Sequence, residues 1–549
     1  MKYYFFLLCS LLTYLANAQT IEVIYDEYYN NNLVTSKKQT AVYAQNNYSV
    51  LFYKDNLKQY PIISTYNNYK TNEQVKKAEV TNLKTIYSQP VIIDNGYNFK
   101  LTDSIKKIKG YNCKLATTIV NSNQISIWYT NELKVNGSPK NLGASLGLVL
   151  EIVINNNSKT TAKSINKIKG KTNLQLPLNV DYLSPIDFDY EIWKARFNEI
   201  NVFKFDTINF SNKQSNLNEV KKYANGTVIT KKIKIPELHL NDQVFIDLTT
   251  FSQGDAYDRT GSVFLIIPDE NKKTFENALQ QGITTLPNYE TKKQEEYRGF
   301  VINDSYTPAL EIMRFFTPFG VQKFNHIELK NKKWQNEVYY RQDISELSQI
   351  ISNKEVMIGI YIGNYDSNGH NVNLNLSIHK GNTNTPKYNN VIPLFNTVNI
   401  LEMAGQNYAT LFEDEEGLQV KFNLPTDLKN AKLRYIATGH GGWSEGDEFL
   451  QKKNSIYLDD NLVYDFIPWR TDCGSYRSFN PSSGNFENGL SSSDLSRANW
   501  CPGTITNPIY IDLGDLKKGE HKITIKIPQG PKQGESFSFW NVSGVLLGN

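Results

Sequence analysis

Two short stretches of the sequence place carboxylates at spacings that suit acid–base chemistry. The first is FSQGDAYDRTGSVFLI, residues 251–266, in which Asp255 and Asp258 stand three apart and Arg259 follows directly. A guanidinium beside a carboxylate favours the charged form, and an ionised carboxylate can orient a water as a general base. The alternative is that both aspartates cap a turn while Arg259 pairs elsewhere.

The second stretch is TGHGGWSEGDEF, residues 438–449, with Glu445, Asp447 and Glu448 just after a strand-like run. The spacing of an EF-hand is missing, which argues against a calcium loop. Because Phe449 follows Glu448 directly, we expect a strand to begin there. Desolvation at the mouth of a strand raises the pKa of a carboxyl group, which suits a proton donor. A solvated turn is the alternative.

A third stretch, residues 483–503, is a long loop of small polar side chains that also holds Arg497 and Trp500. Aromatic faces, arginine and hydroxyl groups are commonly combined in sugar-binding sites. The alternative is a loop that a disulfide between Cys473 and Cys501 merely holds in place.

Histidines and cysteines give no pattern of a metal site. No histidine pair has the spacing HxH or HxxxH, and His440 alone stands beside an acidic cluster, where we expect a hydrogen-bonding role. The chain also lacks a GxSxG elbow and a P-loop.

The N-terminus and the charge limit the class of protein. Residues 1–18 have an early lysine, an apolar core and a small-x-small site, which predicts a cleaved signal peptide and a secreted or periplasmic protein. No later run reaches the roughly 20 apolar residues of a spanning helix. In an exported chain, Cys473 and Cys501 are the economical disulfide pair, which leaves Cys113 free. The formal charge of +4 is dispersed, so nucleic acid binding is not expected.

Hydrophobic periodicity predicts a mostly β protein. Runs such as VNLNLSIHKG and HKITIKI alternate apolar and polar residues, and the best helix candidate, KKTFENALQQ at 272–281, is short. Short strands at close spacing favour sandwiches or jelly rolls. Weakly patterned segments near 191–200 and 381–390 predict three domains, at 19–195, 196–386 and 387–549.

Five segments resemble, in order, the peptide-N-glycosidase F family. They are GDAYDRTGSVFL, ALEIMRFFTPFG, NVIPLF, the segment from Thr438 to Ile456, and SRANWCPG. The resemblance covers roughly residues 200–549. It implies two adjacent eight-stranded antiparallel jelly rolls with an active site in the cleft between them.

The resemblance also implies an activity. The family hydrolyses the amide between asparagine and the first N-acetylglucosamine of an N-linked glycan, so that asparagine becomes aspartate, and it uses no metal or organic cofactor. The expected partners are N-glycosylated proteins and glycopeptides, and a monomer is expected. Two alternatives stay open, which are a glycan-binding protein without activity and an endo-acting glycosidase that leaves one N-acetylglucosamine on the peptide.

The family's essential aspartate and glutamate fall on Asp258 and Glu448. We expect Asp258 to activate a water, Arg259 to keep Asp258 ionised, and Glu448 to assist the leaving group. The resemblance also implies the Cys473–Cys501 disulfide. Further candidates for substrate binding are Arg259, Asp255, Arg497, Trp500, Tyr365 and His440.

One position departs from the family pattern. Gly363, in the run YIGNY, occupies the place of a second glutamate, and Tyr365 occupies that of a tryptophan. Asp366 is a candidate replacement. We expect this departure to bear on the pH profile and the substrate preference.

The N-terminal domain lies outside this resemblance. ISIWYTNEL followed by NLGASLGLVLEIVINN resembles GLPGLI-type domains, although Ser-Leu-Gly stands where Leu-Pro-Gly is usual. We expect an accessory β domain.

Overall fold

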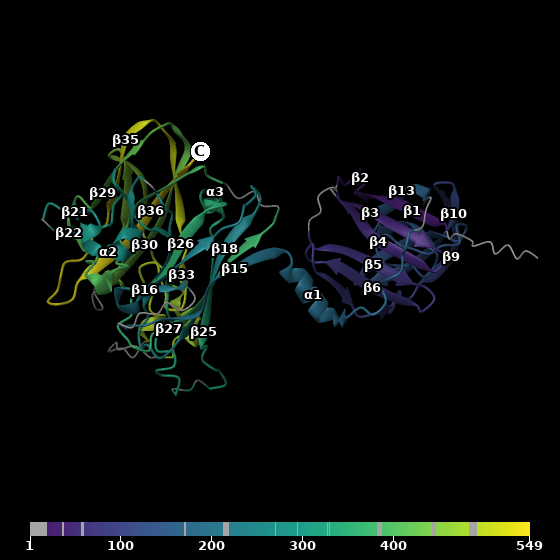
Figure 1. The fold of residues 1–549 in the computed structure, drawn as a ribbon, viewed down its shortest axis with the longest axis horizontal. Helices are drawn as coiled ribbons and strands as arrows, with labels where there is room; N and C mark the ends of the chain where they lie inside the picture. Colours follow the sequence, from purple (N-terminus) through teal and green to yellow (C-terminus); the bar gives the residue numbers. More distant parts are fainter. Residues whose placement is uncertain are drawn as a thin grey trace, which may run out of the picture. The chain divides into compact units, whose positions relative to one another are not determined.

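The computed structural model describes residues 19–35, 38–55, 60–168, 172–211, 219–269, 271–293, 295–326, 328, 330–381, 387–441, 446–481 and 491–549. The predicted signal peptide lies outside these residues. The chain forms two compact units, Met1–Arg196 and Phe197–Asn549 (Figure 1). Strands dominate both units, and the prediction of a mostly β protein is confirmed.

The N-terminal unit is one large sheet whose neighbouring strands are antiparallel, except for β14 and β7 (Figure 1). Its order is β14-β7-β6-β5-β4-β3-β1-β13-β12-β11-β10-β9, with β2 beside β1 and β8 beside β6. The strands are β1 (Thr20–Tyr29), β2 (Asn32–Leu33), β3 (Lys38–Gln45), β4 (Tyr48–Asp55), β5 (Ile62–Asn68), β6 (Glu73–Glu79), β7 (Thr85–Ser88), β8 (Val91–Ile92), β9 (Lys100–Ile108), β10 (Tyr111–Val120), β11 (Asn123–Thr130), β12 (Leu148–Ile154), β13 (Ser158–Ile168) and β14 (Tyr182–Leu183).

The helix α1 (Pro185–Lys194) ends this unit and was not predicted. Ser184 caps it by accepting a hydrogen bond from the backbone N–H of Asp187, and proline occupies its first turn, where no donor is needed. Phe188 and Ile192 pack against a small cluster of buried side chains on the sheet. The run Ser-Pro-x-Asp is a helix start that sequence reasoning could have recognised.

The C-terminal unit begins with an eight-stranded jelly roll. One sheet has the order β15-β27-β18-β25, and the other has the order β16-β17-β26-β19-β24-β33, where β16 and β33 (Ile505–Thr506) are short additions to the eight strands. Along the chain, successive strands of the eight lie in different sheets, except for β19 and β24, which are neighbours in one sheet; this is a jelly-roll arrangement. The strands are β15 (Phe197–Ile208), β16 (Lys221–Tyr223), β17 (Val228–Lys234), β18 (Gln243–Ser252), β19 (Thr260–Ile266), β24 (Leu310–Phe316), β25 (Glu337–Asp343), β26 (Glu355–Ile362) and β27 (His370–His379).

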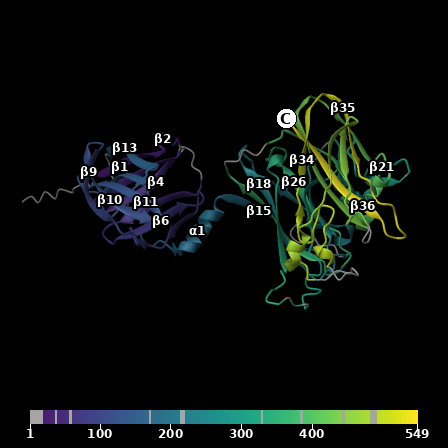
Figure 2. The same ribbon diagram turned by 180° about the vertical axis from the view of Figure 1, so that it is seen from behind.

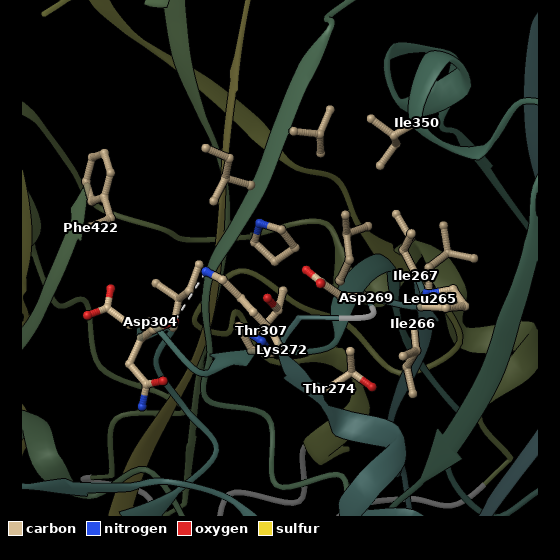
Figure 3. A pocket seen from close by; sticks show the side chains of 18 of the residues that line it. Leu265, Ile266, Ile267, Asp269, Lys272, Thr274, Asp304, Thr307, Ile350 and Phe422 are labelled. Atoms are coloured by element: carbon tan, nitrogen blue, oxygen red, sulfur yellow. Dashed lines mark hydrogen bonds between the residues drawn. The ribbon is translucent and has the colours of Figure 1, made fainter. Parts of the chain in front are cut away.

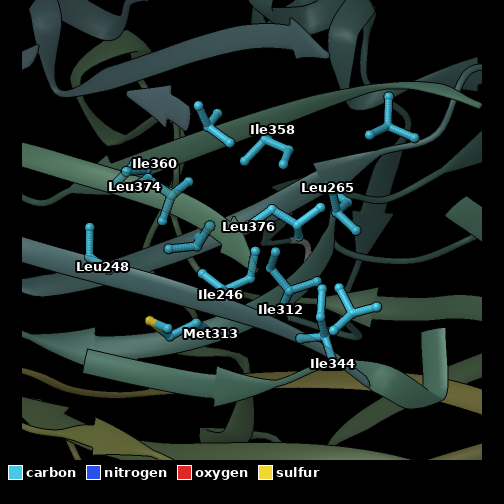
Figure 4. Packing of buried hydrophobic residues seen from close by; sticks show 14 of the residues in the cluster. Ile246, Leu248, Leu265, Ile312, Met313, Ile344, Ile358, Ile360, Leu374 and Leu376 are labelled. Atoms are coloured by element: carbon cyan, nitrogen blue, oxygen red, sulfur yellow. The ribbon is translucent and has the colours of Figure 1, made fainter. Parts of the chain in front are cut away.

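The insertion between β19 and β24 holds β20 (Lys273–Thr274), β21 (Asn288–Glu290), β22 (Glu296–Arg298), β23 (Tyr306–Thr307) and α2 (Phe275–Gln281), which agrees with the predicted helix. A short helix α3 (Ser348–Ile351) precedes β26. Between the two sheets, Ile246, Ile358 and Leu374 meet in one apolar cluster (Figure 4). These side chains come from alternate positions of their strands, because successive residues of a strand face opposite sides.

The second jelly roll repeats the same strand arrangement. Its sheets have the orders β28-β36-β30-β34 and β29-β35-β31-β32, and β36 is drawn in yellow in Figure 2. The strands are β28 (Asn390–Asn396), β29 (Leu418–Leu424), β30 (Leu428–Gly441), β31 (Asn454–Leu458), β32 (Asn461–Phe466), β34 (Ile509–Leu516), β35 (Gly519–Lys526) and β36 (Ser538–Gly548). The predicted pair of jelly rolls is therefore confirmed.

Two features join the rolls. The strand β33 (Ile505–Thr506) belongs to the second half of the chain but pairs with β24 of the first roll. The buried Arg314 on β24 forms an ion pair with Glu311 and donates hydrogen bonds to Thr438 Oγ1 at 2.9 Å and the Asn541 carbonyl at 2.7 Å. Because a buried charge is costly unless it is paired and hydrogen-bonded, these contacts fix the register of one roll against the other.

Candidate active site

Three loops at the junction of the rolls carry the predicted acid–base residues. Asp258 lies between β18 and β19, and Arg497 lies in the loop before β33. Glu448 lies in a turn after β30, and the following strand β31 begins only at Asn454. The prediction that a strand starts at Phe449 is therefore wrong. The turn closes on a hydrogen bond from the Phe449 N–H to the Gly446 carbonyl.

Arg497 stands between the two predicted catalytic carboxylates. Its Nη1 is 3.2 Å from Asp258 Oδ2 and also donates to Glu448 Oε1. The arginine is 2% exposed, whereas Asp258 and Glu448 keep 14% and 18% of their side-chain exposure. The structure thus brings two carboxylates from different rolls to one guanidinium and leaves both accessible from outside.

The surroundings raise the pKa of both carboxyl groups. For Glu448, burial is the largest cause; the positive charge of Arg497 opposes it and the negative charge of Asp258 adds to it, and the pKa rises to about 7. Burial also raises the pKa of Asp258 above its usual range, against the charges of Arg497 and Arg259. The predicted direction for Glu448 is confirmed. A carboxyl group that titrates near neutrality can give or take a proton at physiological pH.

The structure corrects the predicted partner of Arg259. Its Nε and Nη2 donate to the two oxygens of Asp255, at 2.8 and 2.9 Å, rather than to Asp258. Burial tends to raise the pKa of Asp255, but the nearby imidazole of His370, whose Nε2 lies 3.5 Å from Asp255 Oδ2, and the hydrogen bonds from Arg259 outweigh this and lower the pKa to about 2. In this loop Arg259 therefore pairs with Asp255, four residues before it, and not with its neighbour Asp258. Asp255 is buried, so the predicted direct contact between Asp255 and substrate is wrong.

Trp500 and His440 are also buried, which corrects their predicted contact with substrate. Trp500 is 3% exposed, stacks on Phe316 at 4.4 Å and lies 4.3 Å from the Arg497 guanidinium carbon. Its ring has no free face for a sugar. The His440 ring is hydrogen-bonded to Thr438 Oγ1 at 2.8 Å, and burial lowers the pKa of His440 well below its usual range, so the ring stays neutral. Trp500 packs against the Arg497 guanidinium, and the His440 ring packs against Trp500.

The disulfide and Asp447 hold the two loops in place. The Cys473–Cys501 bond is present as predicted, with a Cα–Cα distance of 5.1 Å, and Cys113 is free and buried. Asp447 is buried and accepts hydrogen bonds from Trp540 Nε1 at 2.8 Å and from the Gly530 N–H at 3.1 Å. These hydrogen bonds hold the loop in shape, so Asp447 is not available for proton transfer. Glu445 lies outside the described residues.

Two tyrosines near Arg259 are exposed in the part of the chain that the structure describes. Tyr257 and Tyr365 are 55% and 53% exposed, and the Arg259 guanidinium lies over both rings, at 5.0 and 5.5 Å. Tyr365 also donates to Glu402, which comes from the second roll. Sequence reasoning predicted Tyr365 but missed Tyr257 and Glu402. Tyr257 stands one residue before Asp258, and that adjacency was the available signal.

The space that a side chain at position 363 would occupy is taken by neighbouring groups. A Cβ built on this glycine would lie 2.8 Å from the hydroxyl of Tyr361, which in turn donates to Glu402 Oε2 at 2.9 Å. Asp366 is held in a turn, where its Oδ1 accepts from the Asn368 N–H at 2.7 Å. Glu402, rather than Asp366, is therefore the carboxylate beside Gly363.

A separate cavity of about 580 Å³ lies at the opposite end of β19 (Figure 3). Its lining includes Leu265, Ile350 and Phe422, with Lys272 and Asp304 also lining it. Asp258 precedes the start of β19, and a strand of seven residues spans roughly 20 Å, so this cavity does not include the carboxylates.

Two further searches of the described part of the chain bear on the class of site. No cluster of three or more His, Cys, Asp or Glu side chains that could hold a metal ion occurs there. Within the same residues, the helices are all too short or too polar to cross a membrane.

Comparison with known proteins defines the class. Residues 199–378 match the family model described as "Peptide-N-glycosidase F, N terminal", and residues 407–547 match its C-terminal counterpart. Residues 23–187 match the "N-glycanase peptide, N-terminal domain". The expectation of a family member with an additional N-terminal domain is therefore confirmed, and this domain matches a family model of its own rather than lying outside the resemblance.

Solved structures narrow the class further. The structure of PNGF-II in space group C2 is 48% identical, with a TM-score of 0.85 over 97% of this chain and 98% of that chain. A second structure of PNGF-II, in space group P21, is also 48% identical, with a TM-score of 0.87 over 97% of this chain and 99% of that chain. A search of curated proteins gave no match. The chain belongs to the peptide-N-glycosidase F family.

Proposed function

We infer that the protein is a peptide N-glycosidase, an amidase that removes a whole N-linked glycan from asparagine. The observation that carries the inference is the single guanidinium of Arg497 between Asp258 and Glu448, in a chain of this family. The substrates are N-glycosylated proteins and glycopeptides.

The reaction consumes one water. Asp258 takes a proton from the water, and the oxygen of that water bonds to the carbonyl carbon of the asparagine side chain. The carbon–nitrogen bond then breaks, and Glu448 in its protonated form gives a proton to the leaving nitrogen. The products are an aspartate on the peptide and a glycosylamine, which later hydrolyses to free sugar and ammonia. General acid or base assistance is worth about 10²–10⁴-fold for each group.

The environments of the two carboxyl groups support this division of roles. Both lie against Arg497, but Glu448 titrates at about 7, so a large fraction carries a proton at neutral pH. Asp258 Oδ2 is buried and accepts no hydrogen bond within the described residues. The same oxygen forms the ion pair with Arg497 at 3.2 Å, and we propose that the attacking water supplies its missing hydrogen bond. Two groups with separated roles at one site are the usual arrangement for acid–base catalysis.

Of the other predicted site residues, Tyr365 is proposed to contact substrate, and the rest are proposed to hold the site in shape. Arg497 holds both carboxylates, and Trp500 and His440 position Arg497 without touching substrate. Tyr365 contacts the glycan, and Arg259 and Asp255 hold the first acidic loop in shape. The reaction as written requires no metal or organic cofactor.

The remaining assignments rest on the sequence. We propose that residues 1–18 are a cleaved signal peptide and that the enzyme is exported and acts as a monomer. We also propose three domains, with 19–195 an accessory domain and jelly rolls at 196–386 and 387–549.

The test is the mass of both products from a defined N-glycopeptide. We expect a peptide with aspartate in place of asparagine and a glycan that keeps both core N-acetylglucosamines. A peptide that retains one N-acetylglucosamine would identify an endo-acting glycosidase instead. Saturable binding without any product would identify a glycan-binding protein.

A further inference from the structure

The carboxylate of Glu402 is surrounded by tyrosine hydroxyls from both rolls. Glu402 begins a short 3₁₀ turn (Glu402–Ala404) of the second roll. Its Oε2 accepts from Tyr361 at 2.9 Å, and its Oε1 accepts from Tyr365 and from Tyr408. The hydroxyl oxygens of Tyr365 and Tyr408 also lie 2.9 Å apart, so either hydroxyl can donate to the other tyrosine instead of to Glu402. Hydrogen bonds to a charged acceptor are stronger than neutral ones, so this group of four side chains holds its members firmly.

Only one of the three tyrosines faces outward. Tyr361 is buried and Tyr408 is partly buried, whereas Tyr365 is 53% exposed. An exposed phenol on a loop would ordinarily change rotamer freely, and ordering it costs conformational entropy. The bond to Glu402 removes this freedom before any ligand arrives.

The fixed ring completes a polar and aromatic surface beside Asp258. Arg259 lies over Tyr365 and Tyr257, and its Nε and Nη2 are occupied by Asp255. Sugars present C–H faces that stack on phenol rings and hydroxyls that accept from a guanidinium. A pyranose ring is therefore the chemical class that this surface suits.

Gly363 makes room for the arrangement. A side chain there would meet the Tyr361 hydroxyl at 2.8 Å and displace it from Glu402. The first roll thus contributes Tyr361, Tyr365 and the gap, and the second roll contributes Tyr408 and the carboxylate.

We propose that Glu402 is a positioning residue for glycan recognition, which holds Tyr365 in place as part of a pyranose-binding subsite formed with Tyr257 and Arg259. This inference rests on the proposed function. It assigns Glu402 no part in proton transfer, so its loss weakens binding of the glycan rather than the chemical step.

The test compares Glu402→Ala, Tyr365→Phe and the double variant. Tyr365→Phe keeps the ring and loses the hydroxyl that contacts Glu402 and Tyr408. Each single variant is expected to raise KM for a defined glycopeptide about tenfold, the effect of one hydrogen bond to a charged group, with kcat within about twofold. Because both changes break the same bond, the double variant should be no weaker than either single variant.

Two controls separate the outcomes. Glu416→Ala removes a surface glutamate that pairs with Lys292, and it should change neither parameter. Glycopeptide affinity is also measured by calorimetry without turnover, so a wild type that binds but releases nothing would refute the amidase alone. If Glu402→Ala does not fold, Tyr365→Phe alone decides. Unchanged affinity, a fall in kcat at constant KM, or additive effects in the double variant would overturn the role of Glu402.

Discussion

Arg497 balances two negative charges, and its removal should make the stability of the protein strongly pH-dependent. The change is Arg497→Met, which keeps an unbranched side chain at this position but removes the charge. At a separation of 3.2 Å, a pair of unit charges interacts by about 5 kcal/mol at an effective dielectric constant of 20. The partial exposure of both carboxylates lowers this value. Breaking a buried pair from one side typically costs about 3–5 kcal/mol.

The sign of the pH effect follows from the pKa directions. Burial already raises the pKa of Asp258 and Glu448 in the folded protein, and loss of the cation raises both further. Between the unfolded values of about 4 and the raised folded values, the native state binds more protons than the unfolded state. The free energy of unfolding of Arg497→Met should therefore rise as the pH falls. We expect a deficit of about 3–5 kcal/mol against wild type at pH 8 that shrinks steadily towards pH 4 to 5.

The assay is urea unfolding at half-unit steps from pH 5 to pH 8, with the midpoint and slope compared with wild type. Arg497→Lys is the matched control, since it keeps a positive charge while losing the guanidinium geometry, and its deficit should depend less on pH. A deficit for Arg497→Met that stays constant across this range would refute the reasoning, because the loss would then come from packing against Trp500 rather than from charge.

Three further outcomes are expected. The ratio kcat/KM should fall about tenfold per pH unit above about 7 as Glu448 loses its proton. Glu448→Gln should remove this fall at high pH and lower kcat by about 10²–10⁴-fold. If the fall survives in the variant, it belongs to another group. Replacing both Cys473 and Cys501 by serine should reduce the free energy of unfolding by about 3–4 kcal/mol, the loop-entropy value for a separation of 28 residues, and an unchanged urea midpoint would contradict this. Gly363→Ala should raise KM in the same direction as Glu402→Ala, because its Cβ displaces the Tyr361 hydroxyl, and an unchanged KM would show that Tyr361 adapts without cost.

The fold follows from local patterns that the sequence displays. In β18 the buried and partly exposed residues alternate along the whole strand, and this period of two was visible in the residue types. The pairing of strands across the two sheets was not visible, and it came from the family resemblance. The helix α1 was not predicted, because its sequence lies in a weakly patterned segment, although Ser184 and Pro185 are a standard helix start.

The site was predictable where chemistry sits in a motif and unpredictable where it depends on rotamers or on distant partners. Asp258, Glu448 and Arg497 come from recognisable segments and meet in space. The choice of Asp255 over Asp258 as the partner of Arg259 depends on how the loop turns. The burial of Trp500 depends on Phe316, nearly two hundred residues earlier in the chain.

Glu402 illustrates the same limit. It stands in no motif, and its partner tyrosines on the first roll precede it by 41 and 37 residues. Nothing in the local sequence marks it as different from other surface glutamates. Only the packing of one roll against the other brings its carboxylate to Tyr361 and Tyr365.

The most direct measurement is oxygen transfer from labelled water. A defined N-glycopeptide is incubated in oxygen-18 water with wild type or Asp258→Asn, and the peptide product is analysed by mass spectrometry, with calorimetry to confirm that the variant still binds. We predict loss of the whole glycan and one labelled oxygen in the new aspartate for wild type, and no turnover despite binding for Asp258→Asn. Label in the released sugar's first carbon–oxygen bond with an unlabelled peptide that keeps one N-acetylglucosamine, or full activity of Asp258→Asn, would contradict an amidase centred on Asp258.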